Sequence, residues 1–165
     1  MAFDLFFYGT LRDATVRQIV LGLNIPSAQI EPAVLEGYRC APVDDGRFPA
    51  LVRSVADSAQ GTLVRNVPID AAIRVSHFEG EVADYAVAGV DVRLESGHTV
   101  PAWVYFPTKS LHLCEGYWSI EEWQQTHRAG FVEDAVRHME RTTPGQLNAY
   151  RDAWRSRLNR SPGSG

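Results

Sequence analysis

The chain has only two cysteines in 165 residues, Cys40 and Cys114. A disulfide framework needs several cysteines, and a zinc site needs closely spaced cysteine or histidine ligands. No His-x-x-x-His spacing occurs around the five histidines, which are His77, His98, His112, His127 and His138, and the one Glu-x-x-His spacing, Glu95 to His98, lies in a predicted hairpin turn. We therefore expect no disulfide and no bound metal, and two reduced cysteines that behave as small, partly buried apolar residues.

Long apolar runs and a strong positive charge are also missing. No window approaches the roughly 18 to 20 apolar residues that a membrane-spanning helix requires. The N-terminus lacks the basic start and the small-residue cleavage site of a signal peptide, so we expect a cytoplasmic protein. The formal net charge is -4, and no basic stripe with interleaved aromatics precedes the C-terminal helices. This composition argues against a membrane or a nucleic acid as the main partner.

Length and periodicity indicate a mixed α and β domain over residues 1–160, followed by a disordered tail at 161–165. Helical spacing of apolar residues predicts helices over 14–21, 68–79, 119–139 and 147–158. Asp13 is a candidate N-cap, Ser119 and Glu122 fit a capping box, and the pair Glu79-Gly80 predicts a helix end. Apolar or alternating runs predict strands over 3–7, 30–38, 48–52, 60–67, 85–94 and 99–106, with a hairpin turn at 44–47.

The segment Tyr8-Gly9-Thr10-Leu11-Arg12 follows the first predicted strand directly. Gly9 allows the main chain to approach a bound group closely, and successive N–H groups in a tight turn form a small anion-binding concavity. Considered alone, the segment also fits an ordinary turn at the end of a strand.

Glu79 is the candidate acid-base residue. At the end of a helix it lies against the negative pole of the helix dipole, and the neighbouring Phe78 excludes water. Both effects disfavour the charged carboxylate and raise its pKa, which suits a group that first accepts a proton and then returns it. From composition alone, a solvated glutamate is the more frequent case. Glu81 and Asp84 in the same stretch are further carboxylate candidates.

Three motifs in this order resemble the gamma-glutamylcyclotransferase-like superfamily: Tyr-Gly-Thr-Leu-Arg at 8–12, Phe-Glu-Gly at 78–80 and Val-Tyr at 104–105. The resemblance extends from about residue 3 to 107. It implies an α+β fold in which a small barrel-like sheet has helices packed outside. It also implies an intramolecular reaction, in which the α-amine of a γ-glutamyl group attacks its own γ-carbonyl and releases 5-oxoproline and a free amine.

The resemblance assigns roles to single residues. Glu79 would move the proton, the segment 48–51 would lie near the cavity, and the small-molecule γ-glutamyl substrate would be bound by Tyr8, Gly9, Thr10, Leu11 and Tyr105. Tyr105 fits equally well as a tyrosine packed in a half-buried strand. No cofactor or metal is implied, because the nucleophile is tethered to its target and one carboxylate can serve both proton transfers.

The chain departs from the superfamily at one place, and two other functions also fit the sequence. Ala86-Val87-Ala88 follow Tyr85, where many members of the superfamily carry an arginine, and this leaves open how the outer part of a substrate would be held. A non-catalytic module that uses the same pocket for an acidic small molecule or a chain terminus is the first alternative. The second is an interaction protein that acts through its arginine-rich C-terminal helices.

Overall fold

The computed structural model describes residues 1–83, 85–108 and 111–162, with the side chains of 81–83 left aside. Asp84 and the side chain of Glu81, two of the candidate carboxylates, therefore lie outside the described residues, as do residues 163–165 of the predicted tail. The strands are β1 (Ala2–Phe7), β2 (Ile30–Val43), β3 (Phe48–Pro68), β4 (Tyr85–Leu94) and β5 (Thr99–Pro107). The helices are α1 (Ala14–Leu21), α2 (Ile69–Ala83), α3 (Ile120–Thr126), α4 (Arg128–Glu140) and α5 (Pro144–Arg157).

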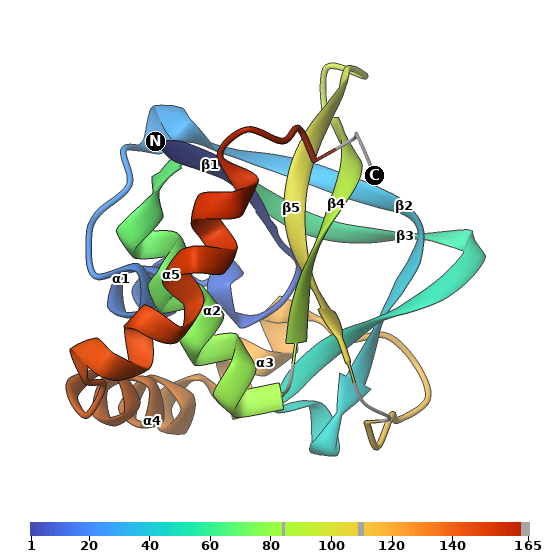
Figure 1. Ribbon diagram of the computed structural model, residues 1–165. Coiled ribbons are helices and arrows are strands. Elements are labelled where there is room, and N and C mark those ends of the chain that lie inside the picture. Colours follow the sequence, from blue (N-terminus) through green and yellow to red (C-terminus); the bar gives the residue numbers. More distant parts are fainter. Residues whose placement is uncertain (84, 109–110, 163–165) are drawn as a thin grey trace.

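The five strands form a closed barrel in the order β1-β3-β2-β4-β5, with the helices outside it (Figure 1). Neighbouring strands are antiparallel except at the closing seam, where β1 pairs with β5 in parallel and Leu5 lies opposite Trp103. Leu5, Phe6 and Phe7 are all buried because β1 faces the barrel interior on one side and covering elements on the other. The predicted α+β barrel with outer helices is confirmed.

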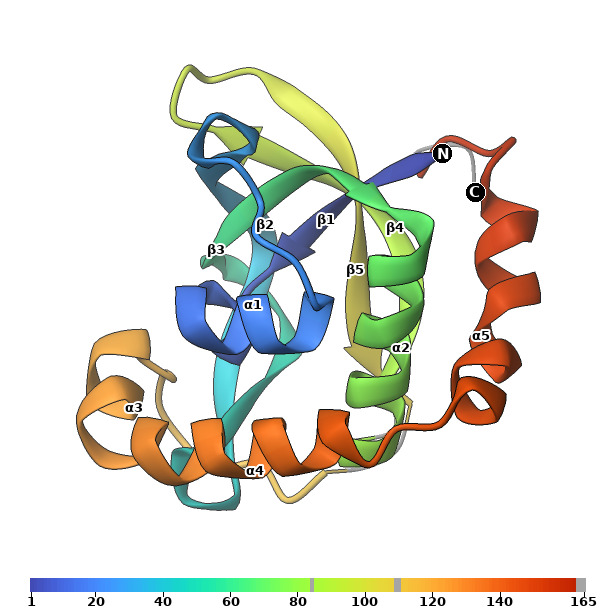
Figure 2. The same cartoon turned by 90° about the vertical axis from the view of Figure 1, so that its left-hand side faces the viewer.

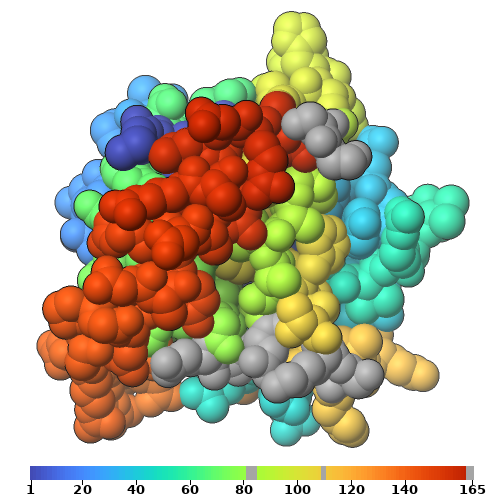
Figure 3. Space-filling view, viewed as in Figure 1, coloured from blue at the N-terminus to red at the C-terminus, as the bar shows by residue number. Residues whose placement is uncertain are grey.

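The helices cover one side of the barrel (Figure 2), where α5 runs beside the outer face of α2. In the space-filling view of Figure 3, α5 lies over α2 and the neighbouring barrel strands. Trp154 of α5 is fully buried, and its ring centroid lies 4.5 Å from that of Phe3 and 6.4 Å from that of Trp103. The last helix therefore contributes to the core. No helix in the described part of the chain is long and apolar enough to cross a membrane.

Several local predictions are confirmed. Asp13 caps α1, because its carboxylate accepts hydrogen bonds from the backbone N–H groups of Thr15 and Val16. The turn at 44–47 joins β2 to β3, and Val43 pairs with Phe48 across it. Ser119 caps α3 by accepting from the N–H of Glu122, but within the described residues the return hydrogen bond from the Glu122 side chain is not formed, so the predicted capping box is only half present. A complete capping box joins Thr143 and Gln146 at the start of α5.

The predicted helix over 119–139 is wrong in one respect, since the chain breaks it into α3 and α4 at His127, whose φ and ψ are -119° and -19°. Trp123 holds α3 against the hairpin turn, where its indole N–H donates to the carbonyl of Arg47 at 2.8 Å. Phe131 instead packs α4 against Phe78 of α2. α4 also reaches the hairpin turn, since Asp134 pairs with Arg47, so the break lets α3 pack on the turn while α4 bridges the turn and α2.

Two further boundaries differ from the prediction. The predicted strands 48–52 and 60–67 are one strand, β3, because residues between them also pair with β2: Arg53 lies opposite Tyr38 and Ser58 opposite Glu36. The predicted helix end at Glu79-Gly80 is wrong, since α2 continues to Ala83. Gly80 makes room for α5 instead, because a Cβ atom there would lie 2.7 Å from the hydroxyl of Tyr150.

Candidate functional site

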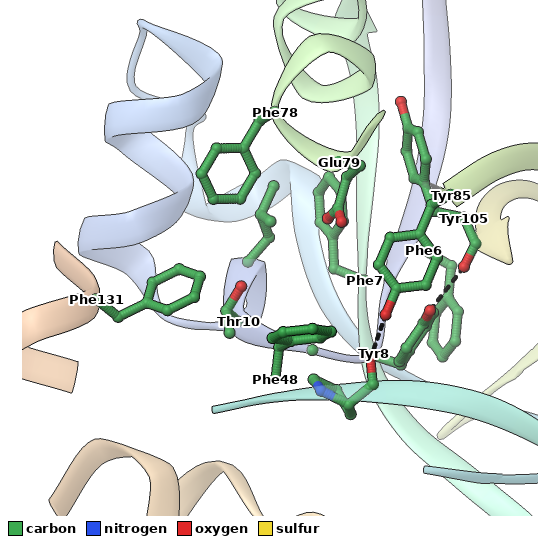
Figure 4. Close-up of a pocket in the computed structure, with 13 residues that line it drawn as sticks. Phe6, Phe7, Tyr8, Thr10, Phe48, Phe78, Glu79, Tyr85, Tyr105 and Phe131 are labelled. Atoms are coloured by element: carbon green, nitrogen blue, oxygen red, sulfur yellow. Dashed lines mark hydrogen bonds between the residues drawn. The ribbon is translucent and has the colours of Figure 1, made fainter. Parts of the chain in front are cut away.

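A pocket lies at the end of the barrel where β1 finishes (Figure 4). Its wall comes from β1 and the turn after it, the start of β3, the last turns of α2, two strands and α4. The lining residues are Phe6, Phe7, Tyr8, Gly9, Thr10, Leu11, Phe48, Pro49, Phe78, Glu79, Tyr85, Tyr105 and Phe131.

The turn after β1 forms one wall of the pocket. Gly9 leads into a short 3-10 helix, Thr10–Arg12, whose first N–H groups have no acceptor within the turn. A Cβ atom on Gly9 would lie 3.0 Å from Cγ of Pro49, so only glycine lets the turn and the start of β3 approach this closely. The two segments that the sequence analysis placed near a cavity, 8–11 and 48–51, therefore meet at Gly9 and Pro49.

Glu79 is half-buried, and its carboxylate points into the pocket (Figure 4). Within the described part of the chain, no group donates a hydrogen bond to this carboxylate or forms an ion pair with it. Burial raises the pKa of Glu79 to about 8. Two causes of a raised pKa were predicted, the helix dipole and the exclusion of water. Burial is the one that acts. The dipole contributes less than expected because Glu79 does not end the helix, since α2 continues to Ala83.

Three tyrosines surround the carboxylate, and their hydroxyl groups are engaged. The Tyr8 hydroxyl donates to the carbonyl of Tyr105 at 2.7 Å, and the Tyr85 hydroxyl donates to the carbonyl of Pro49 at 2.6 Å (Figure 4). The Tyr105 hydroxyl shares a 2.8 Å hydrogen bond with Oγ of Ser76. Burial, reinforced by Tyr85 and Glu79, raises the pKa of Tyr8, and burial likewise raises the pKa values of Tyr85 and Tyr105. All three remain neutral hydrogen-bond donors at physiological pH.

The structure brings all the predicted site residues to one pocket: Glu79, Tyr8, Gly9, Thr10, Leu11 and Tyr105. Tyr105 contributes its ring to the lining while its hydroxyl bonds to Ser76 of α2. Cys40 lies behind the pocket, where its Sγ is 3.9 Å from the carbonyl of Tyr8, and burial raises the pKa of its thiol to about 12. This thiol is therefore protonated and is not a nucleophile.

Phe131 and Tyr85 line the pocket without having been predicted as site residues. Phe131 lies in the predicted helix over 119–139, but periodicity does not say which surface the apolar face of a helix covers. Tyr85 begins a predicted strand, and its hydroxyl bonds to the carbonyl of Pro49. Throughout 1–83, 85–108 and 111–162, no group of three or more His, Cys, Asp or Glu side chains is arranged to hold a metal ion.

Residues 5–125 match the family described as "Gamma-glutamyl cyclotransferase, AIG2-like". The chain belongs to this family. Two relatives come from Arabidopsis thaliana. "Protein AIG2 C" is 27% identical over 132 residues, which is 79% of this chain and 77% of the relative. "AIG2-like protein A" is 24% identical over 138 residues, which is 83% of this chain and 81% of the relative.

Solved structures show the same fold. A solution structure of an Arabidopsis thaliana protein matches with a TM-score of 0.60 and 24% identity, covering 85% of this chain and 83% of that one. A structure titled "Gamma-glutamyl cyclotransferase" matches with a TM-score of 0.54 and 15% identity, covering 90% and 88%. The AIG2-like match ends at residue 125, whereas Phe131 in the pocket wall and Trp154 in the core lie beyond it.

Proposed function

We propose that the protein is a cofactor-free γ-glutamylcyclotransferase that converts a γ-glutamyl amine or γ-glutamyl amino acid into 5-oxoproline and the free amine. The observation that carries this proposal is the Glu79 carboxylate, which points into an aromatic pocket, has no counter-ion among the described residues, and shares the wall with the turn at Gly9. Membership of the family supports the class of reaction.

The reaction needs one carboxylate and a site for an oxyanion. The α-amine nitrogen of the substrate attacks the γ-carbonyl carbon, a carbon–nitrogen bond forms, and Glu79 accepts a proton from the amine. The resulting oxyanion accepts hydrogen bonds from the backbone N–H groups of the turn at Gly9, Thr10 and Leu11. The bond to the original amine then breaks, and Glu79 returns the proton to the departing nitrogen. No water is consumed, and the five-membered lactam is the acyl product.

The environment of Glu79 suits this double transfer. A carboxyl group with its pKa raised to about 8 is much closer to an amine in proton affinity than an ordinary glutamate is. Proton transfer is most efficient when the donor and the acceptor are matched near the working pH. Folding of the tethered substrate into a reactive shape supplies much of the remaining acceleration, and the aromatic wall limits the shapes that the γ-glutamyl chain can adopt.

The test is release of 5-oxoproline from a panel of γ-glutamyl amines and γ-glutamyl amino acids. Glu79→Gln keeps the size of the side chain and removes the base, and we expect kcat to fall by about 10² or more. Glu133→Gln, on the exposed side of α4, removes the same charge away from the pocket and should leave kcat unchanged. Turnover that persists in the Glu79 variant would assign the chemistry to another carboxylate.

A non-catalytic binding module is the second candidate, and one observation favours it. No Arg, Lys or His side chain of the described residues lines the pocket, so a substrate carboxylate would depend on backbone N–H groups alone. A folded wild-type protein that releases no 5-oxoproline from any member of the panel, but binds a γ-glutamyl compound saturably, would support this second function.

A further inference from the structure

A second, polar pocket is lined by residues of α2, of α4 and of the start of α5. Figure 2 shows the end of α4 turning into α5 beside α2. The pocket shares no residue with the one around Glu79. Its lining residues are all polar, namely His77, Asp134, Arg137, His138, Arg141, Thr142 and Gln146. A concave site with this lining is suited to a charged ligand rather than to an apolar one.

Positive charge exceeds negative charge at this site, although the whole chain carries a net charge of -4. Asp134 provides the carboxylate of the pocket, and two arginines already share it. Its Oδ1 accepts from Arg137 at 2.7 Å and its Oδ2 accepts from Arg47 at 2.6 Å. Within the described residues, Arg141 has neither an ion pair nor a side-chain hydrogen bond. Its guanidinium is therefore free to bind an anion.

One further feature of the pocket points to a ligand. Nε2 of His138 is buried without a hydrogen-bond partner among the described residues, and the imidazole stacks on that of His77 with 5.0 Å between centroids. A buried nitrogen without a partner costs free energy, which a hydrogen bond formed on ligand binding would recover. The positive end of the α5 dipole and the negative end of the α4 dipole both lie at the site and oppose each other, so the arginine side chains set the sign of its charge.

We propose that this pocket binds a phosphate group. A guanidinium presents parallel N–H donors that match the oxygens of a phosphate, and a phosphate offers more acceptor oxygens than a carboxylate does to the arginines of the lining. The phosphate is inorganic phosphate or part of a small phosphomonoester, since the same donors serve both. Because His77 precedes Phe78 and Glu79 on α2, the site is next to the element that carries the candidate acid-base residue.

The proposal is tested by titrating inorganic phosphate into the full-length protein by calorimetry, with chloride holding the ionic strength constant. We expect saturable binding by the wild type and a Kd at least about tenfold weaker for Arg141→Gln. Arg155→Gln, on the exposed part of α5, removes the same charge elsewhere and should stay within about twofold of the wild type. Equal loss in both variants, or no saturation in the wild type, would overturn the proposal.

A second readout locates the ligand. Phosphate should shift the side-chain NMR signals of His138 and His77 in the wild type but not in Arg141→Gln, and unshifted signals in the wild type would contradict the proposed site. Glycerol 3-phosphate, compared with glycerol and inorganic phosphate, distinguishes the two sources, because tighter binding of the ester assigns the site to a phosphorylated metabolite. These experiments measure binding and not turnover, so their outcome is independent of the proposed cyclotransferase activity.

Discussion

Glu79 is a residue whose position costs stability. Burial in the aromatic pocket disfavours the charged form of its carboxylate, which has no counter-ion in the described part of the chain, and raises its pKa from 4.5 to about 8. Between these values the folded state binds a proton that the unfolded state has released. The free energy of unfolding therefore falls as the pH rises through this window. Above pH 8 the folded state bears the full cost of burying the charged Glu79 carboxylate.

A neutral residue at this position should remove the penalty. We expect Glu79→Gln to melt close to the wild type near pH 4.5 and at a temperature at least about 2 °C higher than the wild type near pH 8. Thermal melts followed by circular dichroism across this pH range measure the difference. Glu133→Gln, which removes an exposed carboxylate, is the control and should follow the wild type. A melting difference for Glu79→Gln that does not change with pH would mean that the carboxylate is charged throughout the range.

Asp13 has two roles, and only one of them could be predicted from the sequence. Asp13 was predicted as the cap of α1, because an aspartate before an amphipathic run is a local signal. Its second role was not predictable: Oδ2 of the same carboxylate accepts from Arg128 at 2.8 Å and from Gln124 at 3.1 Å, over 100 residues along the chain. Contacts of this kind depend on how the helices pack, which a local pattern does not contain.

Among the elements, α5 is linked to the pocket wall by a buried chain of hydrogen bonds. The indole N–H of Trp154 donates to Oγ of Ser76 at 2.8 Å, and the same Oγ bonds to the hydroxyl of Tyr105 at 2.8 Å. Ser76 lies on α2 one turn before Glu79, and Tyr105 lies on β5. The last helix therefore fixes the position of α2 against the barrel.

Removal of the Trp154 side chain should be among the more damaging single changes. Trp154→Ala deletes a fully buried ring and removes the indole N–H that donates to Ser76, and we expect a loss of about 3–5 kcal/mol in the free energy of unfolding. Urea denaturation of this variant measures the loss. Tyr117→Ala removes an aromatic ring that is 65% exposed and should cost less than about 1 kcal/mol. Similar costs for the two variants would show that α5 is only loosely attached.

The predicted helices and strands agree with the structure where the spacing of apolar residues is regular and a capping residue or a turn marks each end. Examples are α1 and the hairpin of β4 and β5. The break between α3 and α4 escaped prediction because apolar spacing continues through it, from Trp123 to Phe131. The resemblance to the superfamily predicted which residues form the pocket, and the periodicity of apolar residues did not. Neither predicted that Phe131 is part of the pocket wall.

For the whole molecule, the C-terminal third is part of the fold and not an appendage. A chain ending at residue 142 would lose α5 and uncover the rings of Phe3 and Trp103 against which Trp154 packs. We expect this truncation to lose its cooperative thermal transition and to expose apolar surface, which dye binding detects. An interaction protein that used these helices only as an outer arm would instead keep a cooperative melt after truncation.

The parallel seam between β1 and β5 has a consequence for the order in which the molecule is assembled. The strand before the segment at 8–12 is synthesised well ahead of its partners, since it pairs with β3 and with β5, which ends at Pro107. Such distant pairings form slowly, because a long loop of chain must close before they gain any contact. β1 therefore waits for strands about 60 and 100 residues further along, and a nascent chain has no enclosed pocket until β5 has been translated.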